Sequence, residues 1–423
     1  MTPEIEKRIK AVRAGRVPAG YKRTKVGIVP KDWGEVRFHD MFSRVVRKNK
    51  EGNTNVLTIS AQYGLINQNE FFNKTVASDD KSNYYLMKKG EFAYNKSYSN
   101  GYPFGALKRL DFYDKGIVSP LYICFAASEN NQCPDFYVHY FEAGLMNKEI
   151  QAFAQEGARN HGLLNISVDD FFNSNLLNPP LSEQKKIAEI LATQDRVIEL
   201  KEKLIAEKQN QKKYLSQILL TGKKRVGDYK DPWEYSALSN YLTIKDVRQI
   251  PNDEAPLMAF IAGIGVSPKG ERYDRSFLVK NDKKEYKRTD LNDFIYSSNN
   301  LDVGSIGLNS YGSASISVVY EIFSVNSNAV PVVLSSIIQL PENLNYALRF
   351  RQGAIYGQYR IYAEDFLSMK IKIPSLPEQK AIADVLSAAD EEILLMQKDL
   401  EQEKLKKKSL MQLLLTGLVR VNE

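Results

Sequence analysis

The motif that comes nearest to enzyme chemistry is Asn178-Pro179-Pro180-Leu181. It mimics the Asn-Pro-Pro-aromatic loop of amino-methyltransferases, but leucine stands at the aromatic position. No strand followed by a glycine-rich cofactor loop precedes it. A proline placed just ahead of a helix explains the same residues completely. We therefore expect no catalysis at this motif.

Other short patterns that could bind nucleotides or metals are incomplete. Residues 263–265 and 304–307 are too short for a dinucleotide fingerprint, and residues 222–224 lack the rest of a phosphate-binding loop. Two cysteines and three histidines supply neither a disulfide framework nor a convincing zinc site. No nucleophile–base pair or paired-carboxylate motif stands out, although carboxylates far apart in sequence could still converge. We expect no catalytic residue, cofactor or metal in this chain.

Polar and aromatic side chains recur instead in two loops of each half of the chain. In each half one loop follows a predicted strand, and the other comes shortly before a proline-rich segment. Arg, Lys, Asn and Gln donors match base edges in the major groove, while Ser, Tyr and Lys reach phosphates. One such loop alone is more commonly a solvated loop, but recurrence at equivalent places favours DNA binding. The residues expected to contact DNA are Lys96, Tyr98, Asn100, Arg159, Asn160, Ser298, Asn299, Asn300, Gln358 and Arg360.

Length and composition are those of an ordinary globular protein. The 423 residues are 26% charged and 43% hydrophobic, enough for two to four domains. No run of 18 apolar residues occurs, and residues 1–16 lack the apolar core of a signal peptide. We therefore expect a cytoplasmic protein with no membrane part. The net charge of +7 arises mainly from residues 1–25 and 179–226, so charge permits DNA binding without arguing for it.

An internal repeat is the strongest signal in the sequence. Residues 179–226 align without a gap to residues 374–421, an offset of 195, with 22 identities in 48 positions. Proline near the start, an acid in the first turn (Glu183, Glu378) and glycine at the end (Gly222, Gly417) predict one long helix in each copy. Pro377 is expected at the first helical position.

Each predicted helix carries an apolar seam that it cannot bury alone. The seam residues are spaced by four, by seven or by sums of these. About forty residues at ~1.5 Å each make a helix of roughly 60 Å. Because the two copies match in length, we expect them to pack on each other; the alternative is that each docks separately on its own domain. The seams are Ile187, Leu191, Ile198, Ile205, Leu215 and Leu219 in the first copy, and Ile382, Leu386, Ile393, Leu400, Leu410 and Leu414 in the second.

The blocks before each helix, residues 26–178 and 227–373, are rich in Tyr, Phe, Ser and Asn. Both open on a similar segment that ends in tryptophan, Trp33 and Trp233. Short β-prone runs predict strands at residues 56–59, 117–125, 316–323 and 329–334. The expected order is a basic amphipathic segment (1–25), a globular domain (26–178), a helix (179–226), a second globular domain (227–373) and a second helix (374–423).

At this point the sequence resembles a known family, the specificity subunits of type I restriction–modification systems. The resemblance rests on the paired Pro-x-Leu-x-Glu-Gln junctions at residues 179–184 and 374–379, each opening a long helix that ends Leu-Thr-Gly. Residues 157–171 and 353–366 also resemble the family's approach to each junction. The likeness covers essentially the whole chain, with the globular blocks matching only in outline.

The resemblance implies a fold and a function. The fold is α+β, with two related target-recognition domains joined and spaced by two long helices that form an antiparallel coiled coil with pseudo-twofold symmetry. Each domain reads one half of a split, asymmetric site in double-stranded DNA. The chain itself has no catalysis; it recruits two modification subunits, which methylate adenine using S-adenosylmethionine, and through them restriction subunits that use ATP and Mg²⁺.

Two other classes of function are kept as alternatives. One is a two-domain adaptor whose globular domains bind proteins and whose coiled coil dimerises it. The other is a standalone nuclease or methyltransferase, which predicts cleavage or methyl transfer by the isolated chain. DNA binding weakens steeply between ~50 and ~200 mM salt, whereas apolar protein contacts do not, so salt dependence separates the first alternative.

Overall fold

The computed structural model describes residues 2–60, 63–72, 80–98, 101–128, 132–156, 164–268, 284–299, 301, 305–355 and 358–421. The chain divides into two compact units. The first unit holds residues 1–202 and 398–423, and the second holds residues 203–397. In the described ranges no helix combines the length and the apolar character that a bilayer crossing requires.

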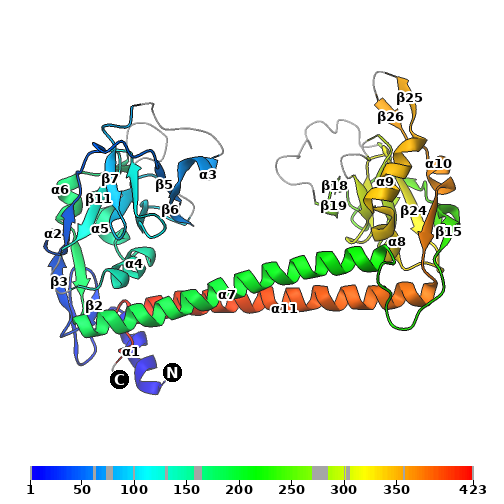
Figure 1. Ribbon diagram of the computed structural model, residues 1–423. Coiled ribbons are helices and arrows are strands. Elements are labelled where there is room, and N and C mark those ends of the chain that lie inside the picture. The colour runs from blue at the N-terminus through cyan, green and yellow to red at the C-terminus, as the bar shows by residue number, and fades with distance from the viewer. Residues whose placement is uncertain are drawn as a thin grey trace. The chain divides into compact units, whose positions relative to one another are not determined.

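The first unit begins with a helix and then alternates short strands with short helices (Figure 1). Its elements are α1 (Pro3–Arg13), β1 (Tyr21–Arg23), β2 (Ile28–Pro30), β3 (Gly34–Arg37), α2 (Phe38–Met41), β4 (Phe42–Arg44), β5 (Leu57–Ser60), β6 (Gly64–Asn67), α3 (Gln68–Phe72), β7 (Tyr85–Lys88), β8 (Phe92–Asn95), β9 (Ala106–Arg109), β10 (Lys115–Val118), β11 (Ile123–Ala127), α4 (Pro134–Glu142), α5 (Asn147–Phe153), β12 (Gln155–Glu156), β13 (Leu164–Asn165), α6 (Val168–Phe172) and β14 (Asn175–Asn178).

In its described residues the second unit repeats much of the order that starts at β3. They are β15 (Glu234–Ala237), η1 (Leu238–Asn240), β16 (Leu242–Ile244), β17 (Arg248–Gln249), β18 (Ala259–Ile261), β19 (Gly265–Ser267), β20 (Tyr286–Thr289), β21 (Phe294–Ser297), β22 (Ile306–Leu308), β23 (Ala314–Ile316), β24 (Tyr320–Val325), α8 (Pro331–Ile338), α9 (Pro341–Ala347), η5 (Leu348–Phe350), β25 (Gln352–Ile355), β26 (Gln358–Arg360), α10 (Ala363–Ser368) and β27 (Lys370–Ile373). Two long helices, α7 (Leu181–Leu220) and α11 (Leu376–Leu414), are shared between the units.

Each unit is built on a four-stranded antiparallel sheet. The strand order is β4-β11-β8-β9 in the first unit and β16-β24-β21-β22 in the second. Smaller pairs also correspond: β5-β6 to β18-β19, β14-β3 to β27-β15, and the hairpin β12-β13 to β25-β26. The expected fold class, α+β with two related domains and two long paired helices, is confirmed.

Three of the expected strands differ from the structure. The runs 117–125 and 316–323 are each broken by a turn into two strands, β10 and β11 in one case and β23 and β24 in the other. Pro120 lies in the first of these turns, where a residue without an N–H costs no ladder bond. The expected strand at 329–334 was wrong, since α8 begins there with Pro331 at its start. A continuous apolar run fits a buried helix as well as a strand.

The two long helices begin close to the predicted positions. A glycine with positive φ follows the end of each long helix, Gly222 at 69° after α7 and Gly417 at 67° after α11. The N–H groups of Gly222 and Lys224 bond carbonyls in the last turn of α7, which satisfies the free end of the helix. Pro377 is the second helical residue rather than the first, because α11 begins at Leu376. That position also lacks an intrahelical acceptor for an N–H, so proline costs nothing there.

A buried junction fixes α7 to the globular part of the first unit. Glu183 and Gln184, both at most 1% exposed, point into it. Trp33 donates its Nε1–H to Glu183 over 2.9 Å, and Arg420 donates from Nε and Nη2 over 2.7 and 2.8 Å. Gln184 Oε1 accepts a bond of 2.9 Å from the backbone N–H of Cys133, just before α4. The buried charge is therefore paired and the buried amide is bonded, as burial requires.

The second unit repeats this junction atom by atom. Glu378 accepts from Trp233 Nε1 at 3.1 Å and from Arg225 Nη2 at 2.6 Å. Gln379 Oε1 accepts from the N–H of Val330 at 2.8 Å, just before α8. Arg225 and Arg420 are 195 residues apart, the offset of the sequence repeat. In each unit, then, the segment after one long helix supplies the arginine that closes the junction at the start of the other.

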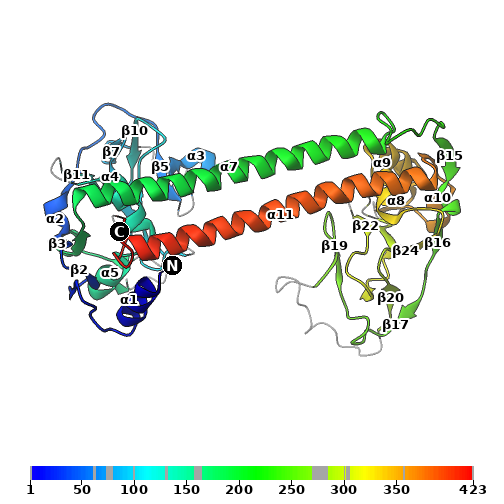
Figure 2. The ribbon, with the colours of Figure 1, turned by 90° about the horizontal axis from the view of Figure 1, so that it is seen from below.

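Within each unit the two long helices lie side by side in opposite directions (Figures 1 and 2). In the first unit Lys407 pairs with Asp195, and Lys201 pairs with Asp399. In the second unit the equivalent of the first pair is Lys212 with Asp390. From the first of these pairs to the second, the residue number rises from 195 to 201 on α7 and falls from 407 to 399 on α11, so the two helices are antiparallel. Nine of the twelve predicted seam residues are buried, and the half-buried ones are Ile198, Leu215 and Leu410.

The described ends of the chain meet in the first unit (Figure 2). Arg8 of α1 donates to the carbonyl of Leu418 over 3.4 Å, and the Tyr21 hydroxyl donates to the carbonyl of Gly417 over 2.6 Å. Ile9 is the buried residue of α1. The basic N-terminal segment therefore covers the end of α11 with its apolar side and leaves Lys7, Lys10 and Arg13 exposed.

Candidate nucleic-acid interface

The strand β8 of the first unit ends at Asn95, and the first predicted DNA-contacting residue, Lys96, follows it. The carbonyl of Lys96 accepts a hydrogen bond of 3.0 Å from the N–H of Leu164 in β13. This bond joins the residue that follows β8 to strand β13 of the hairpin that precedes the junction. Burial lowers the pKa of the Lys96 ammonium, whereas Tyr98 is 61% exposed.

The second unit has the same connection. Ser298 follows β21, and its carbonyl accepts a hydrogen bond of 3.0 Å from the N–H of Ile361, directly after β26. The side chain of Ser298 is buried and donates to the carbonyl of Val319 over 3.3 Å, while Asn299 is exposed. Gln358 lies in β26, where it pairs with Ile355. The side chain of Ser298 is thus buried in this structure, and its contact with DNA stays a prediction.

Four of the predicted contact residues, Asn100, Arg159, Asn160 and Asn300, lie outside the described residues, and so does the side chain of Gln358. Lys96, Tyr98, Ser298, Asn299 and Arg360 lie among the described residues, and their contact with DNA stays a prediction. Within each unit a backbone hydrogen bond joins the residue after the strand to the hairpin or to the residue that follows it.

Arg360 ends β26 and is held by a charged group that the sequence analysis missed. Its Nη2 lies 2.8 Å from Oε1 of Glu321 in β24, and its guanidinium carbon lies 5.1 Å from the centre of the Tyr362 ring. Oε2 of Glu321 accepts from the buried ammonium of Lys287 over 3.0 Å. The signal that could have found Glu321 is that it is the one acid in the apolar run 316–323.

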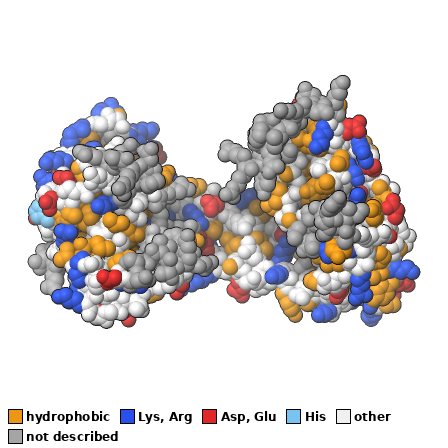
Figure 3. All heavy atoms as spheres, turned by 90° about the horizontal axis from the view of Figure 1, so that it is seen from above, with side chains coloured by type: hydrophobic (Ala, Val, Ile, Leu, Met, Phe, Trp, Pro, Cys, Tyr) orange, Lys and Arg blue, Asp and Glu red, His pale blue; other side chains and the backbone are white. Residues whose placement is uncertain are grey.

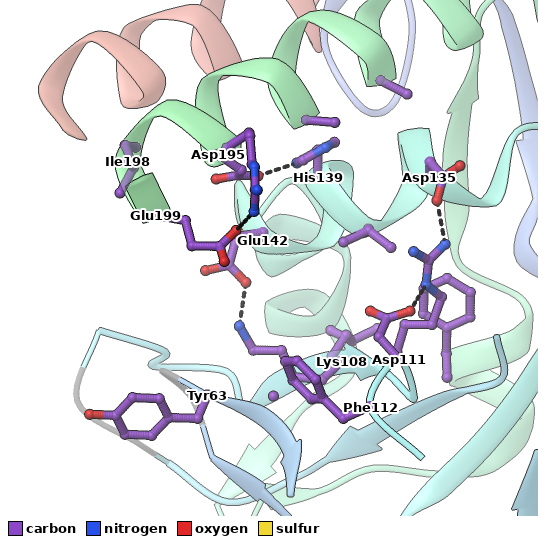
Figure 4. Close-up of a pocket in the computed structure, with 18 of the residues that line it drawn as sticks. Tyr63, Lys108, Asp111, Phe112, Asp135, His139, Glu142, Asp195, Ile198 and Glu199 are labelled. Atoms are coloured by element: carbon purple, nitrogen blue, oxygen red, sulfur yellow. Dashed lines mark hydrogen bonds and ion pairs between the residues drawn. The ribbon is translucent and has the colours of Figure 1, made fainter. Parts of the chain in front are cut away.

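A groove with a volume of about 1310 Å³ opens in the first unit between α4, the β9–β10 turn and the first half of α7 (Figure 4). Eight carboxylates and five Lys or Arg residues line it. Lys108 pairs with Glu142 and Lys407 with Asp195, so these cations are already neutralised. His139 Nδ1 lies 3.8 Å from Asp195 Oδ2, and burial lowers the pKa of this histidine. An acidic lining repels phosphates, so this groove is a poor surface for DNA.

The space-filling view shows one face of each unit (Figure 3). In the first unit hydrophobic side chains gather in the middle of that face, with Lys and Arg along its edge. In the second unit hydrophobic, basic and acidic side chains are mixed. This agrees with the near-neutral composition of both blocks. Sequence-specific contacts would then come from a few placed side chains rather than from a broad basic surface.

Known proteins resemble this chain over most of its length. A protein of Methanocaldococcus jannaschii named as the MjaX specificity subunit of a type I restriction enzyme is 26% identical over 430 residues, covering 95% of this chain and 97% of that protein. The MjaVIII specificity subunit from the same organism is 26% identical over 336 residues, covering 73% and 75%. The crystal structure of the HsdS subunit from Thermoanaerobacter tengcongensis covers 92% of this chain and 98% of its own at 15% identity, with a TM-score of 0.52.

The model of one protein family, described as the type I restriction modification DNA specificity domain, matches residues 30–210 and 266–405. These ranges include the sheet of the first unit, most of the sheet of the second and most of both long helices. Together with the duplicated junctions and the paired helices, this match shows that the chain belongs to the type I restriction–modification DNA specificity family.

Proposed function

We propose that this chain is the DNA-reading subunit of a type I restriction–modification complex, in which each unit reads one half of a bipartite site in double-stranded DNA. One observation carries the proposal. In both units the end of the central strand is bonded to the hairpin before the junction, through Leu164 to Lys96 and through Ile361 to Ser298. The same connection between strand and hairpin thus occurs in two domains with the same topology. This duplication is what a protein that reads two half-sites requires.

The two half-sites should differ in sequence. The equivalent positions carry different side chains, since Lys96 in the first unit corresponds to Ser298 in the second. Base choice depends on the donors and acceptors offered to the groove edges. Two domains with the same topology but different side chains at equivalent positions therefore predict an asymmetric target.

Chemistry and energy conversion are assigned to partner subunits. The proposed partners are two modification subunits, which use S-adenosylmethionine to methylate adenine, and restriction subunits that use ATP and Mg²⁺. The two junctions, which have matching contacts, support two equivalent docking sites. We further propose that the chain has no catalysis of its own and works in the cytoplasm with these partners.

A domain exchange tests the assignment of half-sites. Residues 26–178 are replaced by the equivalent block of another specificity subunit, and adenine methylation is mapped by sequencing. The expected result is one changed half-site and one unchanged half-site. A change in both halves, or in neither, would contradict the proposal.

Two measurements on the purified protein separate the competing classes. Binding to a duplex carrying the mapped site should weaken steeply between ~50 and ~200 mM salt, because phosphate contacts release counterions. The isolated chain should neither methylate nor cleave that duplex, whatever cofactors are added. Methylation by a preparation shown to be free of other subunits would overturn the non-catalytic assignment.

A further inference from the structure

A buried carboxylate in the second unit holds two cations at once. Glu321 is 8% exposed and lies on β24, in the middle of the four-stranded sheet. One of its oxygens contacts Lys287 over 3.0 Å and the other contacts Arg360 over 2.8 Å. Lys287 is itself buried and lies 3.3 Å from Asp246. Lys287 therefore supplies Glu321 with one cation inside the sheet and shares that charge with Asp246.

Arg360 is the exposed member of this group. Its side chain is 46% exposed, and its guanidinium lies over the ring of Tyr362. Among the described residues Glu321 alone accepts a hydrogen bond from it. A guanidinium has five N–H donors in a rigid plane. Arg360 is therefore fixed along one edge and over one face, while its other donors are available to a ligand.

Such a fixed guanidinium has a preferred partner in DNA. Arginine bonds guanine through O6 and N7 in the major groove, which is the commonest specific contact to a base. A rotamer that is held before binding loses less entropy when it binds. Arg360 ends the hairpin β25–β26, which projects from the second unit in Figure 1 and is bonded to the strand end at Ser298.

Among the described residues of the first unit, other side chains stand at the positions of Glu321 and Lys287. In the strand register Glu321 lies opposite Tyr296, and in the first unit Ile123 lies opposite the equivalent Tyr94. Lys287 lies opposite Arg248 in the register, and in the first unit Tyr85 lies opposite Lys48, so Tyr85 is the equivalent of Lys287. Ile123 and Tyr85 thus replace the buried Glu–Lys pair. Any base preference that depends on this pair therefore belongs to the half-site of the second unit alone.

We propose that Arg360 reads a guanine in the half-site of the second unit, and that Glu321 is the positioning residue that orients it. This inference rests on the proposed function, and it adds the identity of one base and the group that selects it. Glu321 does not contact the DNA.

The test uses the complex assembled with its modification subunits and duplexes that carry the mapped site. In the wild type, 7-deazaguanine at the read guanine, which lacks the N7 acceptor, should weaken binding several-fold. Arg360→Ala should reduce the preference for that base pair by about 5- to 150-fold. Arg360→Lys keeps the charge but loses the planar fork, so it should lose the guanine preference while keeping affinity for non-specific DNA. In both variants 7-deazaguanine should no longer matter.

Glu321→Gln keeps the shape of the side chain and removes its charge. It should lower the same preference by a smaller factor and leave the other base pairs unchanged, which a general loss of folding would not do. Arg349→Ala, at an exposed arginine of the same unit, is the matched control and should leave base choice unchanged.

The outcomes separate the two proposals. If the second unit's half-site contains no guanine, or if Arg360→Ala keeps the guanine preference while both half-sites are still read, the inference on Arg360 is wrong and the proposed function stands. If Arg360 variants lose the preference and Glu321→Gln does not, the positioning role fails. If the wild-type complex shows no sequence preference in either half, the proposed function fails and the inference with it.

Discussion

The junction at Glu183 makes a quantitative prediction about folding. Its carboxylate is 1% exposed and accepts hydrogen bonds from Trp33 Nε1 and from two nitrogens of Arg420. Glu183→Ala removes the acceptor and leaves a mostly buried guanidinium with only Asp32 at its outer edge. Breaking a buried ion pair by removing one partner costs about 3–5 kcal/mol. That is a large share of the roughly 5–15 kcal/mol by which domains are stable.

Three companion variants show whether the loss of stability predicted for Glu183→Ala comes from the ion pair between Glu183 and Arg420. Glu183→Gln keeps an acceptor for Trp33 and is expected to cost about 1–2 kcal/mol. Glu378→Ala removes the equivalent group of the second unit and should cost about as much as Glu183→Ala. Glu189→Ala, an exposed position on the same helix, should change stability by less than about 0.5 kcal/mol.

The assay is urea unfolding followed by circular dichroism and by tryptophan fluorescence, which reports on Trp33 and Trp233 at the two junctions. A double variant, Glu183→Ala with Arg420→Ala, should cost less than the sum of the two single changes, because each single change already loses the interaction between Glu183 and Arg420. If Glu183→Ala cost no more than Glu189→Ala, or if the two single effects simply added, the reasoning about the junction would be refuted.

The remaining predictions concern the paired helices, a buried histidine and a glycine. Inserting four residues near 209–211 together with four near 404–406 should lengthen both helices by roughly 6 Å. The unspecified gap between unchanged half-sites should then widen by one or two base pairs, at ~3.4 Å each. If methylation mapping finds the original gap in the folded protein, the helices do not set it. Because burial lowers the pKa of His139, its stabilising contribution is present above its unfolded pKa of about 6.5 and is lost as the pH falls through the lower folded value. Wild type should therefore lose more stability than His139→Gln between pH 7.5 and 5, and equal shifts in melting temperature would contradict this. Gly222→Ala should cost about 1–2 kcal/mol for its positive φ, and Gly417→Ala should cost more, because a Cβ there would lie 2.5 Å from Pro30 Cδ; equal unfolding midpoints for the two variants would count against that contact.

The sequence by itself determined the features that depend on local spacing. The gapless repeat, the apolar seams and the proline and glycine near the helix ends were enough to predict α7 and α11 and to indicate the family. The expected fold class followed from the same signals. These features are legible because neighbouring residues encode them, through the helical period and through the backbone preferences of proline and glycine.

The tertiary structure decided which distant residues meet. The repeat contains Arg225 and Arg420, but only the fold shows that each closes the junction at the start of the other long helix. The apolar run at 329–334 became α8 because a run buried on all sides has no period that separates helix from strand. Glu321 was passed over for a related reason. A buried acid is tolerated only beside its cations, and Lys287 and Arg360 are brought to it by strands distant in the sequence.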